Sequence, residues 1–253
     1  MEVFAILLAA GKGTRMKSEL PKVLHPVGGT PMIGRLVDKL EAMPITRIVA
    51  VVGHRSDLVR AYLGTRVTYV QQEAQLGTAH AVLQAERLLS RRSGSTLVLT
   101  GDTPLIRSST LEQLLAAQRT QDSAGVVLTA LVQDPAGYGR IIRDPVSGEV
   151  IDIVEDKDAT PEQKRIHEIN TGIFCFDNES LFQALPGIAN HNAQREYYLT
   201  DIVKVMRQGG ESGSRKRFAA LILDDPTEVM GINTPEQLEA ANRAFYAHIG
   251  IFS

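Results

Sequence analysis

The chain has 253 residues, which suffices for one large α/β domain or two smaller ones at roughly 150 residues per domain. Its 27 basic and 29 acidic residues give a formal net charge of −2. The chain as a whole is therefore not positively charged enough to attract nucleic acid or a membrane surface. Its single cysteine excludes an internal disulfide, and no apolar run approaches the roughly 20 residues that span a bilayer. We therefore expect a soluble, cytoplasmic protein.

Strand-like and helical patterns alternate through the first half of the chain. Apolar runs predict strands at residues 3–8, 47–52, 67–70 and 95–100. Apolar residues at helical spacing predict helices at residues 31–43, 57–63 and 77–90. Strands that alternate with helices of this length are typical of βαβ units. The sequence therefore predicts an α/β fold with a mostly parallel sheet and helices on both of its faces.

The regular alternation of strands and helices does not continue in the second half of the chain. Strands are predicted at residues 124–132, 173–176 and 218–223, and the segments 138–143 and 149–154 flank a polar turn and indicate a hairpin. Charged residues 156–165 predict an exposed loop or short helix, and residues 209–214 are the most loop-like stretch. Cys175 lies within an apolar run, so we expect a packed, unreactive thiol.

A further helix is predicted to begin after Thr234. Thr234 suits the N-cap, Pro235 the first helical position, and Gln237 follows three residues after the cap, as in a capping box. The chain has no internal repeat and no low-complexity segment. We therefore expect one domain, with a nucleotide-type α/β half followed by a mixed half that could shape a substrate pocket.

Residues 7–29, which leave the first predicted strand, form a loop with glycines and clustered basic side chains. Gly11 and Gly13 fit neither a P-loop nor a dinucleotide fingerprint, because Met16 stands where each motif needs glycine. What remains is a Gly-x-Gly turn whose backbone N–H groups can face a phosphate. A surface loop with ordinary solvated charges is the alternative. The setting of Lys22 between Pro21 and an apolar pair favours a fixed cation beside an anion.

Asp102 follows the predicted strand at residues 95–100, just as the glycine loop follows the first strand. In open α/β sheets, ligands bind beyond the carboxyl ends of the strands. Taken alone, Asp102 before Thr103-Pro104 is more typical of a turn or cap residue than of a ligand. The shared position at strand ends is the first indication of a site.

Several ordered motifs extend along essentially the whole chain. They are residues 8–16 with 21–24, 75–81, 101–105, 137–140, 153–160, 168–172 and 192–201. Together they resemble the sugar-1-phosphate nucleotidylyltransferases, and most of all the uridylyltransferase domains of the bifunctional N-acetylglucosamine-1-phosphate uridylyltransferases/glucosamine-1-phosphate acetyltransferases. The resemblance implies a Rossmann-like nucleotide-diphospho-sugar transferase fold.

The resemblance also implies a Mg²⁺-dependent reaction. An oxygen of N-acetylglucosamine 1-phosphate would attack the α-phosphorus of UTP, release pyrophosphate and form UDP-N-acetylglucosamine, a precursor of peptidoglycan and lipopolysaccharide. Two highly charged anions must meet, so such catalysis rests on positioning and charge neutralisation. Arg15 and Lys22 match the catalytic cations of the family, and Asp102 and Asn233 match its Mg²⁺ ligands. Without the resemblance, Asn233 would be taken for a turn or helix-capping residue.

The binding positions implied by the resemblance fall into two groups. Those for the nucleotide are Leu8, Ala9, Ala10, Gly11, Gly13, Thr14, Gln72, Gly77 and Thr78. Those for the sugar phosphate are Thr100, Gly101, Gly139, Glu155, Asn170 and Thr171. An amide such as Gln72 can both donate to and accept from a pyrimidine edge, although it could also be a solvent-facing amide at a strand end.

The same resemblance divides the chain into a nucleotidylyltransferase domain, 1–230, and a segment with a metal ligand and a C-terminal helix, 231–253. Two departures stand out. Thr-Pro-Glu follows Asn233 where the family has Asn or Asp and then Arg, and the hexapeptide repeats of the acetyltransferase β-helix are absent from these residues. We therefore expect no acetyl transfer by these residues, and a monomer or weak oligomer. Two alternatives stay open: another nucleotide or sugar phosphate, including a molybdenum-cofactor or CTP-dependent relative, and a catalytically silent nucleotide-sugar sensor.

Overall fold

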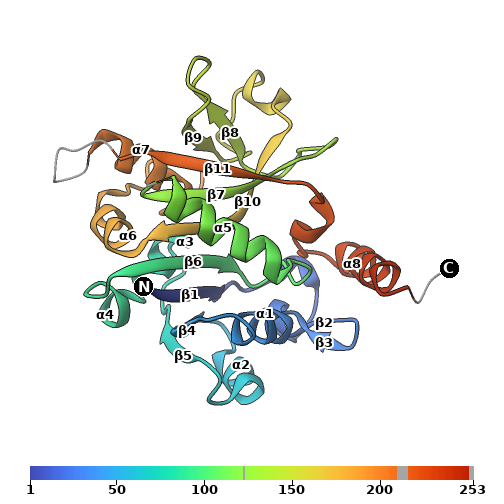
Figure 1. Ribbon diagram of the computed structural model, residues 1–253. Helices are drawn as coiled ribbons and strands as arrows, with labels where there is room; N and C mark the ends of the chain where they lie inside the picture. Colours follow the sequence, from blue (N-terminus) through green and yellow to red (C-terminus); the bar gives the residue numbers. More distant parts are fainter. Residues whose placement is uncertain (122, 210–215, 251–253) are drawn as a thin grey trace.

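The computed structural model describes residues 1–121, 123–209 and 216–250, and within these ranges the main sheet has nine strands (Figure 1). They are β1 (Glu2–Ala9), β4 (Arg47–Val52), β5 (Thr68–Gln71), β6 (Gly94–Thr100), β7 (Gly125–Leu131), β8 (Arg140–Arg143), β9 (Val150–Val154), β10 (Glu168–Asp177) and β11 (Phe218–Leu223). A small hairpin pairs β2 (Pro26–Val27) with β3 (Thr30–Pro31). The α-helices are α1 (Met32–Glu41), α2 (Ser56–Leu63), α3 (Thr78–Leu83), α4 (Glu86–Leu89), α5 (Ser108–Thr120), α6 (Asn178–Ala184), α7 (Ile202–Gln208) and α8 (Pro235–His248).

The sheet order is β11-β7-β10-β6-β1-β4-β5, with β8 joining β10 and β9 joining β8. β1 runs parallel to β4 and β6, β4 is parallel to β5, and β11 is parallel to β7. β10 is antiparallel to both of its long neighbours, β6 and β7. The predicted mostly parallel sheet is therefore confirmed.

Helices cover both faces of the sheet because its central strands are apolar on both faces. Alternate residues of β1 separate into two cores: Val3, Ala5 and Leu7 pack with α1, α2 and α5, whereas Phe4 and Ile6 pack with α3, α4, α6 and α7. Figure 1 shows α5 crossing one face of the sheet and α8 lying apart, beside the β2–β3 hairpin. The carboxyl ends of β1 and β6 are adjacent, since Leu8 pairs with Thr100.

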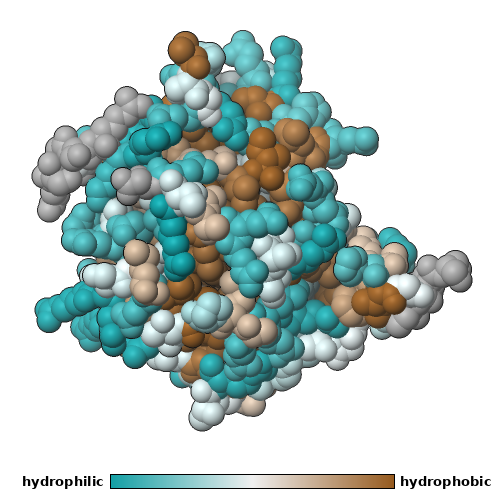
Figure 2. Space-filling model, in the orientation of Figure 1, coloured by the Kyte–Doolittle hydropathy of each residue, from teal (hydrophilic) through white to brown (hydrophobic). Residues whose placement is uncertain are grey.

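Exposed apolar side chains occur at several places on the surface of the described residues. Figure 2 shows hydrophobic surface over β11 and the end of β7, where Ile222 and Leu131 are 47% and 57% exposed. Cys175 is fully buried in β10, and burial raises the pKa of its thiol, in agreement with an unreactive cysteine. No helix in the described part of the chain combines the length and apolar character needed to cross a membrane.

Most predicted elements are confirmed within one or two residues, but the helix predicted at 77–90 is wrong. The chain forms α3 and α4 instead, with a turn at Gln84 and Ala85. The side-chain amide of Gln84 donates to the carbonyl of His80, 2.9 Å away, while the backbone N–H of Gln84 donates to Ala81. The Gln84 side chain thus donates to the His80 carbonyl, which in a continuous helix would accept from the backbone N–H of Gln84.

Several other elements differ from the expectations. α5, α6, α7 and the β2–β3 hairpin were not predicted from the sequence, although α5 buries Leu111, Leu114 and Leu115 at helical spacing. β10 begins at Glu168, five residues before the predicted strand, and its register shifts between Asn170 and Phe174. Of the loop predicted at 209–214, residues 210–214 lie outside the described residues.

Candidate active site

A cavity of about 360 Å³ lies at the carboxyl ends of β1 and β6. It is lined by Leu8, Ala9, Ala10, Gly11, Lys22, Val23, Gln72, Gln75, Gly77, Thr78, Ala81, Thr100, Gly101, Asp102 and Glu196. Eleven of these fifteen residues are among the positions singled out from the sequence. Since parallel strands deliver their carboxyl ends to one edge, segments that are far apart in the chain form one cavity there.

The glycine loop approaches Lys22 closely because Gly13 lacks a side chain. Gly13 has φ +62°, in the left-handed region, and a Cβ on it would lie 2.6 Å from Lys22 Cβ. Gly11, in contrast, has open space around it, because among the described residues only Gly11 itself and its two chain neighbours could lie within 4 Å of the place that a Cβ would take. The side chains of Thr14 and Arg15 are exposed on the short 3₁₀ turn that follows. Loop and lysine are therefore held together while the first glycine stays accessible.

Lys22 is the centre of a polar cluster that joins distant parts of the chain. Its Nζ lies 2.6 Å from Asp102 Oδ2 and 3.0 Å from Asn233 Oδ1. Arg15 donates to the same Asn233 oxygen over 2.9 Å. The backbone N–H of Ile232 donates to the Asp102 carbonyl over 3.0 Å, which fixes the two segments against each other. Two cations and two accepting oxygens, from three separate regions of the chain, thus meet in one cluster.

The donor set of this cluster suits Mg²⁺. Asp102 Oδ2 and Asn233 Oδ1 both lie within 3.0 Å of a single cationic nitrogen, so the two oxygens converge. A carboxylate and an amide oxygen are hard ligands, and Mg²⁺ is commonly bound by one or two carboxylates with water and phosphate completing its shell. The described residues contain no cluster of three or more histidine, cysteine, aspartate or glutamate side chains that could hold a metal.

Gln72 is buried rather than solvent-facing, with 4% of its surface exposed. Its side-chain nitrogen donates to the Gly77 carbonyl over 3.1 Å and lies 3.0 Å from His80 Nδ1. A Cβ on Gly77 would lie 2.5 Å from the Tyr197 carbonyl oxygen, so the chain packs tightly there. The Thr78 hydroxyl accepts a hydrogen bond from the Leu199 N–H over 2.9 Å. These contacts hold Gln72, Gly77 and Thr78 as one wall of the cavity.

Three of the residues predicted for the sugar lie together beside this cavity. A Cβ on Gly139 would lie 3.4 Å from Asn170 Cβ and 3.5 Å from Glu155 Oε2. The Asn170 N–H donates to the Gly139 carbonyl over 2.8 Å, and the Thr200 hydroxyl donates to Glu155 Oε1 over 3.1 Å. Burial raises the pKa of Glu155 above its usual value, while the Thr200 bond opposes this shift. The three residues can surround a small polar ligand.

Thr171 is placed differently from its neighbour Asn170. Successive residues of a strand point to opposite faces. The Thr171 hydroxyl donates to the carbonyl of Leu128 over 2.7 Å, and only 7% of Thr171 is exposed. The structure therefore does not bring this side chain together with the others. Thr100, which lines the cavity at the ends of β1 and β6, lies close to Gly172, because a Cβ on Gly172 would lie 3.1 Å from Thr100 Cγ2.

Several residues near the site received no role from the sequence. Gln75 donates to the Ala10 carbonyl over 2.7 Å and so ties the wall at 72–78 to the glycine loop. Burial raises the pKa of Tyr138, whose hydroxyl lies against the Gly231 N–H and near Asp102. Both stand within motifs noted from the sequence, as does Glu196, but a motif does not say which of its side chains enters a site.

Comparisons with known proteins show which family the chain resembles. Residues 5–193 match the MobA-like NTP transferase domain family. The chain is 49% identical over 246 residues to the bifunctional protein GlmU of Enterococcus faecalis, an alignment that covers 97% of this chain and 52% of that protein. It is 50% identical over 240 residues to GlmU of Brevibacillus brevis, covering 95% of this chain and 51% of that protein. The chain thus spans about half the length of these curated relatives.

Among solved structures, the chain resembles a UDP-glucose pyrophosphorylase complexed with UDP-glucose. The TM-score is 0.76, and the match covers 98% of this chain and 100% of the other. Because only 20% of the aligned residues are identical, this likeness establishes the fold alone.

Proposed function

The chain belongs to the MobA-like NTP transferase domain family, and from this premise we propose that it is a UTP:N-acetylglucosamine-1-phosphate uridylyltransferase. The observation that carries the proposal is the convergence of Lys22, Arg15, Asp102 and Asn233 at a cavity beyond the carboxyl ends of the strands. The chain is 49% and 50% identical to two bifunctional relatives over nearly its whole length, which supports UTP and N-acetylglucosamine 1-phosphate as the substrates.

The cations act on the phosphates in this proposal. The N–H groups of residues 10–14 bind the triphosphate, and Arg15 stabilises the negative charge that develops on the leaving pyrophosphate. Lys22 binds the α-phosphate and the phosphate of the sugar, and so brings the attacking and accepting groups together. Its present partners, Asp102 and Asn233, are within 3.0 Å, so a small movement of a flexible side chain separates it from them.

Asp102 and Asn233 hold Mg²⁺ in the proposed enzyme. The ion supplies further neutralisation of phosphate charge when bound. Asn233 reaches this position because Ile232 is bonded to Asp102 and because α8 begins two residues later, at Pro235. The segment 231–253 is accordingly a functional part of the nucleotidylyltransferase unit formed with residues 1–230.

In this proposal, one group of residues selects the nucleotide and another selects the sugar phosphate. Gln72, Gly77 and Thr78 bind the uracil, with Leu8, Ala9, Ala10, Gly11, Gly13 and Thr14 along the rest of the nucleotide. Thr100, Gly101, Gly139, Glu155, Asn170 and Thr171 bind the sugar phosphate, where glycine permits close approach and the polar side chains meet hydroxyl and acetamido groups. Of these, Thr171 can contribute only through its backbone, since its hydroxyl is bonded to Leu128. We place the reaction in the cytoplasm, on small-molecule substrates, in a monomer or weak oligomer.

A substrate panel tests the proposal. Purified protein with Mg²⁺, UTP and N-acetylglucosamine 1-phosphate should release pyrophosphate and form a product with the mass of UDP-N-acetylglucosamine. Replacement of UTP by CTP or GTP, or of the sugar by glucose 1-phosphate, should lower kcat/KM. Absence of pyrophosphate in every combination would contradict the enzyme class, and preference for another pair would contradict the stated substrates.

A further inference from the structure

A second cavity, of about 190 Å³, lies behind the turn that carries Asp102. Its walls come from α1, residues 104–107, the 3₁₀ turn Pro226–Val229 and the last turns of α8. Among the residues the structure describes, it shares no lining residue with the cavity at the carboxyl ends of β1 and β6 (the nucleotide cavity). The two cavities are therefore separate, although Asp102 lines one and Pro104 lines the other.

One part of this cavity is apolar. Leu105, Ile106 and Phe245 line it, together with Pro104 and Ala244. Phe245 is held in place by the β2–β3 hairpin, because Gly28 lies directly against its ring and donates to Asn242 of the same helix over 2.8 Å. An apolar wall of this kind favours a ligand with an apolar body.

The cavity is also lined by charged residues, and its one carboxylate is already engaged. Glu228 is 4% exposed and accepts hydrogen bonds from the Arg107 N–H over 2.9 Å and the Thr110 hydroxyl over 2.7 Å. Arg107 lies 3.4 Å from Glu228 and 2.6 Å from Asp225. These charges compensate one another.

Arg35 and Lys39, one turn apart on α1, donate to backbone carbonyls, and the carboxylates of Glu228 and Asp38 act on Lys39 only from a distance. Lys39 Nζ donates to the Pro104 carbonyl over 2.5 Å, and Arg35 donates to the carbonyls of Val27 and Gly28 while stacking 4.0 Å above the Phe245 ring. In the described parts of the chain, neither cation forms an ion pair. Burial, and then the neighbouring Arg35, lower the pKa of Lys39 to about 8. Glu228 and Asp38 oppose this shift only in part, and an anion in the cavity would favour the charged form of Lys39 further.

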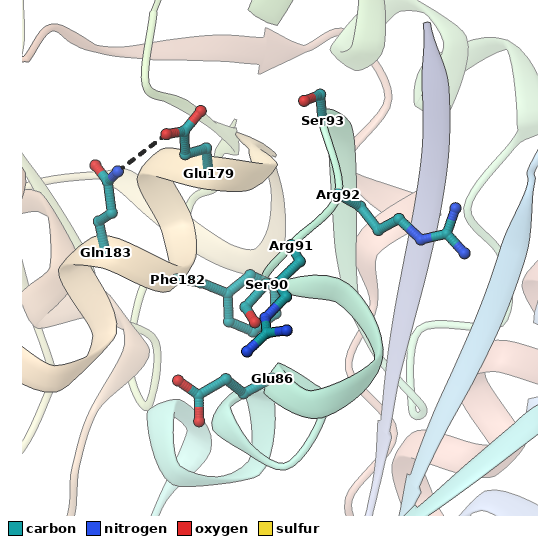
Figure 3. A pocket seen from close by; sticks show the side chains of 8 residues that line it. All are labelled: Glu86, Ser90, Arg91, Arg92, Ser93, Glu179, Phe182 and Gln183. Atoms are coloured by element: carbon teal, nitrogen blue, oxygen red, sulfur yellow. Dashed lines mark hydrogen bonds between the residues drawn. The ribbon is translucent and has the colours of Figure 1, made fainter.

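Another pocket, of about 390 Å³ between α4 and α6, lacks this imbalance (Figure 3). It is lined by Arg91 and Arg92 but also by Glu86 and Glu179. Figure 3 shows Arg92 pointing away from the acidic side chains, and it lies 3.4 Å from Glu2 instead. Opposite charges there are equal in number, so that pocket favours neither sign of ligand.

We propose that the cavity between α1 and α8 is a binding site for a small organic anion with an apolar body, such as an aryl phosphate. Lys39 and Arg35 hold its anionic end, and Phe245 and Leu105 contact its apolar body. The site is separate from the one that binds the nucleotide, and the proposal does not depend on the enzyme activity.

Isothermal titration calorimetry with phenyl phosphate tests this site. The Lys22→Met variant serves as the reference protein, because it removes a cation through which the probe could bind in the nucleotide cavity. In this background, Lys39→Met should weaken binding at least tenfold. Ala244→Leu, which fills the cavity and keeps every charge, should do the same and provides a second route should Lys39→Met fail to fold. Lys164→Met, which removes an exposed lysine elsewhere, should leave the affinity unchanged.

The outcomes are distinct. One phenyl phosphate per chain in the Lys22→Met protein, with loss in both cavity variants, supports the site. Absence of binding to that protein, or equal affinity in the cavity variants, overturns it. Phenol that binds as tightly as phenyl phosphate would refute the role of the cations. Inorganic phosphate that binds as tightly would refute the role of the apolar wall.

Discussion

Gly13→Ala tests whether close contact between the glycine loop and Lys22 is essential to the site. The new Cβ would lie 2.6 Å from Lys22 Cβ, whereas ordinary contacts are at 3.4–4 Å. Lys22 Cβ is next to the backbone, so it cannot swing away as the end of a side chain would. The substitution also puts a Cβ on a residue with φ +62°, which costs about 1–2 kcal/mol. Overpacking adds about 1–3 kcal/mol, so we expect the free energy of unfolding to fall by about 2–5 kcal/mol.

Gly148→Ala is the matched control. Gly148 has φ +73°, and a Cβ on it meets no described atom within 4 Å, so only the backbone cost of about 1–2 kcal/mol should appear. At about 2–4 °C per kcal/mol for a chain of this size, thermal unfolding should separate the two variants.

The kinetic measurement gives a second, independent result. Displacing Lys22 from Asp102 and Asn233 by an ångström should lower kcat/KM for pyrophosphate release by about 10²-fold in Gly13→Ala. Gly148→Ala should leave it unchanged. If Gly13→Ala matches Gly148→Ala in both Tm and kcat/KM, then the contact between loop and lysine does not matter and the reasoning is refuted.

Three further predictions concern other parts of the molecule. Lys22→Ala should cost about 2.7–4 kcal/mol of transition-state stabilisation, measured as kcat/KM, and a near-normal value would remove its catalytic role. Burial raises the pKa of Glu155 in the folded protein. The wild type should therefore lose stability relative to Glu155→Gln as the pH rises from the ordinary glutamate pKa through the raised pKa. Urea unfolding of both proteins at pH 4.5 and 7.5 checks this, and a difference in the free energy of unfolding that is the same at both pH values contradicts it. Thr234→Ala should lower the free energy of unfolding by about 0.5–2 kcal/mol, because Thr234 and Gln237 form a complete capping box; Thr65→Ala, at an exposed turn position outside α8, provides a comparison.

Much of the fold can be predicted because its signals are local. The apolar runs of β1, β4 and β6 predict strands that are buried on both faces. The capping box of α8 lies within the four residues from Thr234 to Gln237. The break between α3 and α4 is an exception at the same scale. It depends on which of two donors, a backbone N–H or the Gln84 side chain, takes the His80 carbonyl, and composition does not decide that.

The candidate site divides in a similar way. The sequence by itself determined which residue types follow the strands: glycines and cations after β1, and a carboxylate after β6. Only the tertiary structure brought Asn233 within 3.0 Å of Lys22, although 211 positions separate them in the chain. It also buried Gln72 and turned Thr171 away from Asn170. Those outcomes depend on sheet register and on the packing of α8, which sum many weak contacts between distant segments, whereas strand and cap signals are complete within a few neighbouring residues.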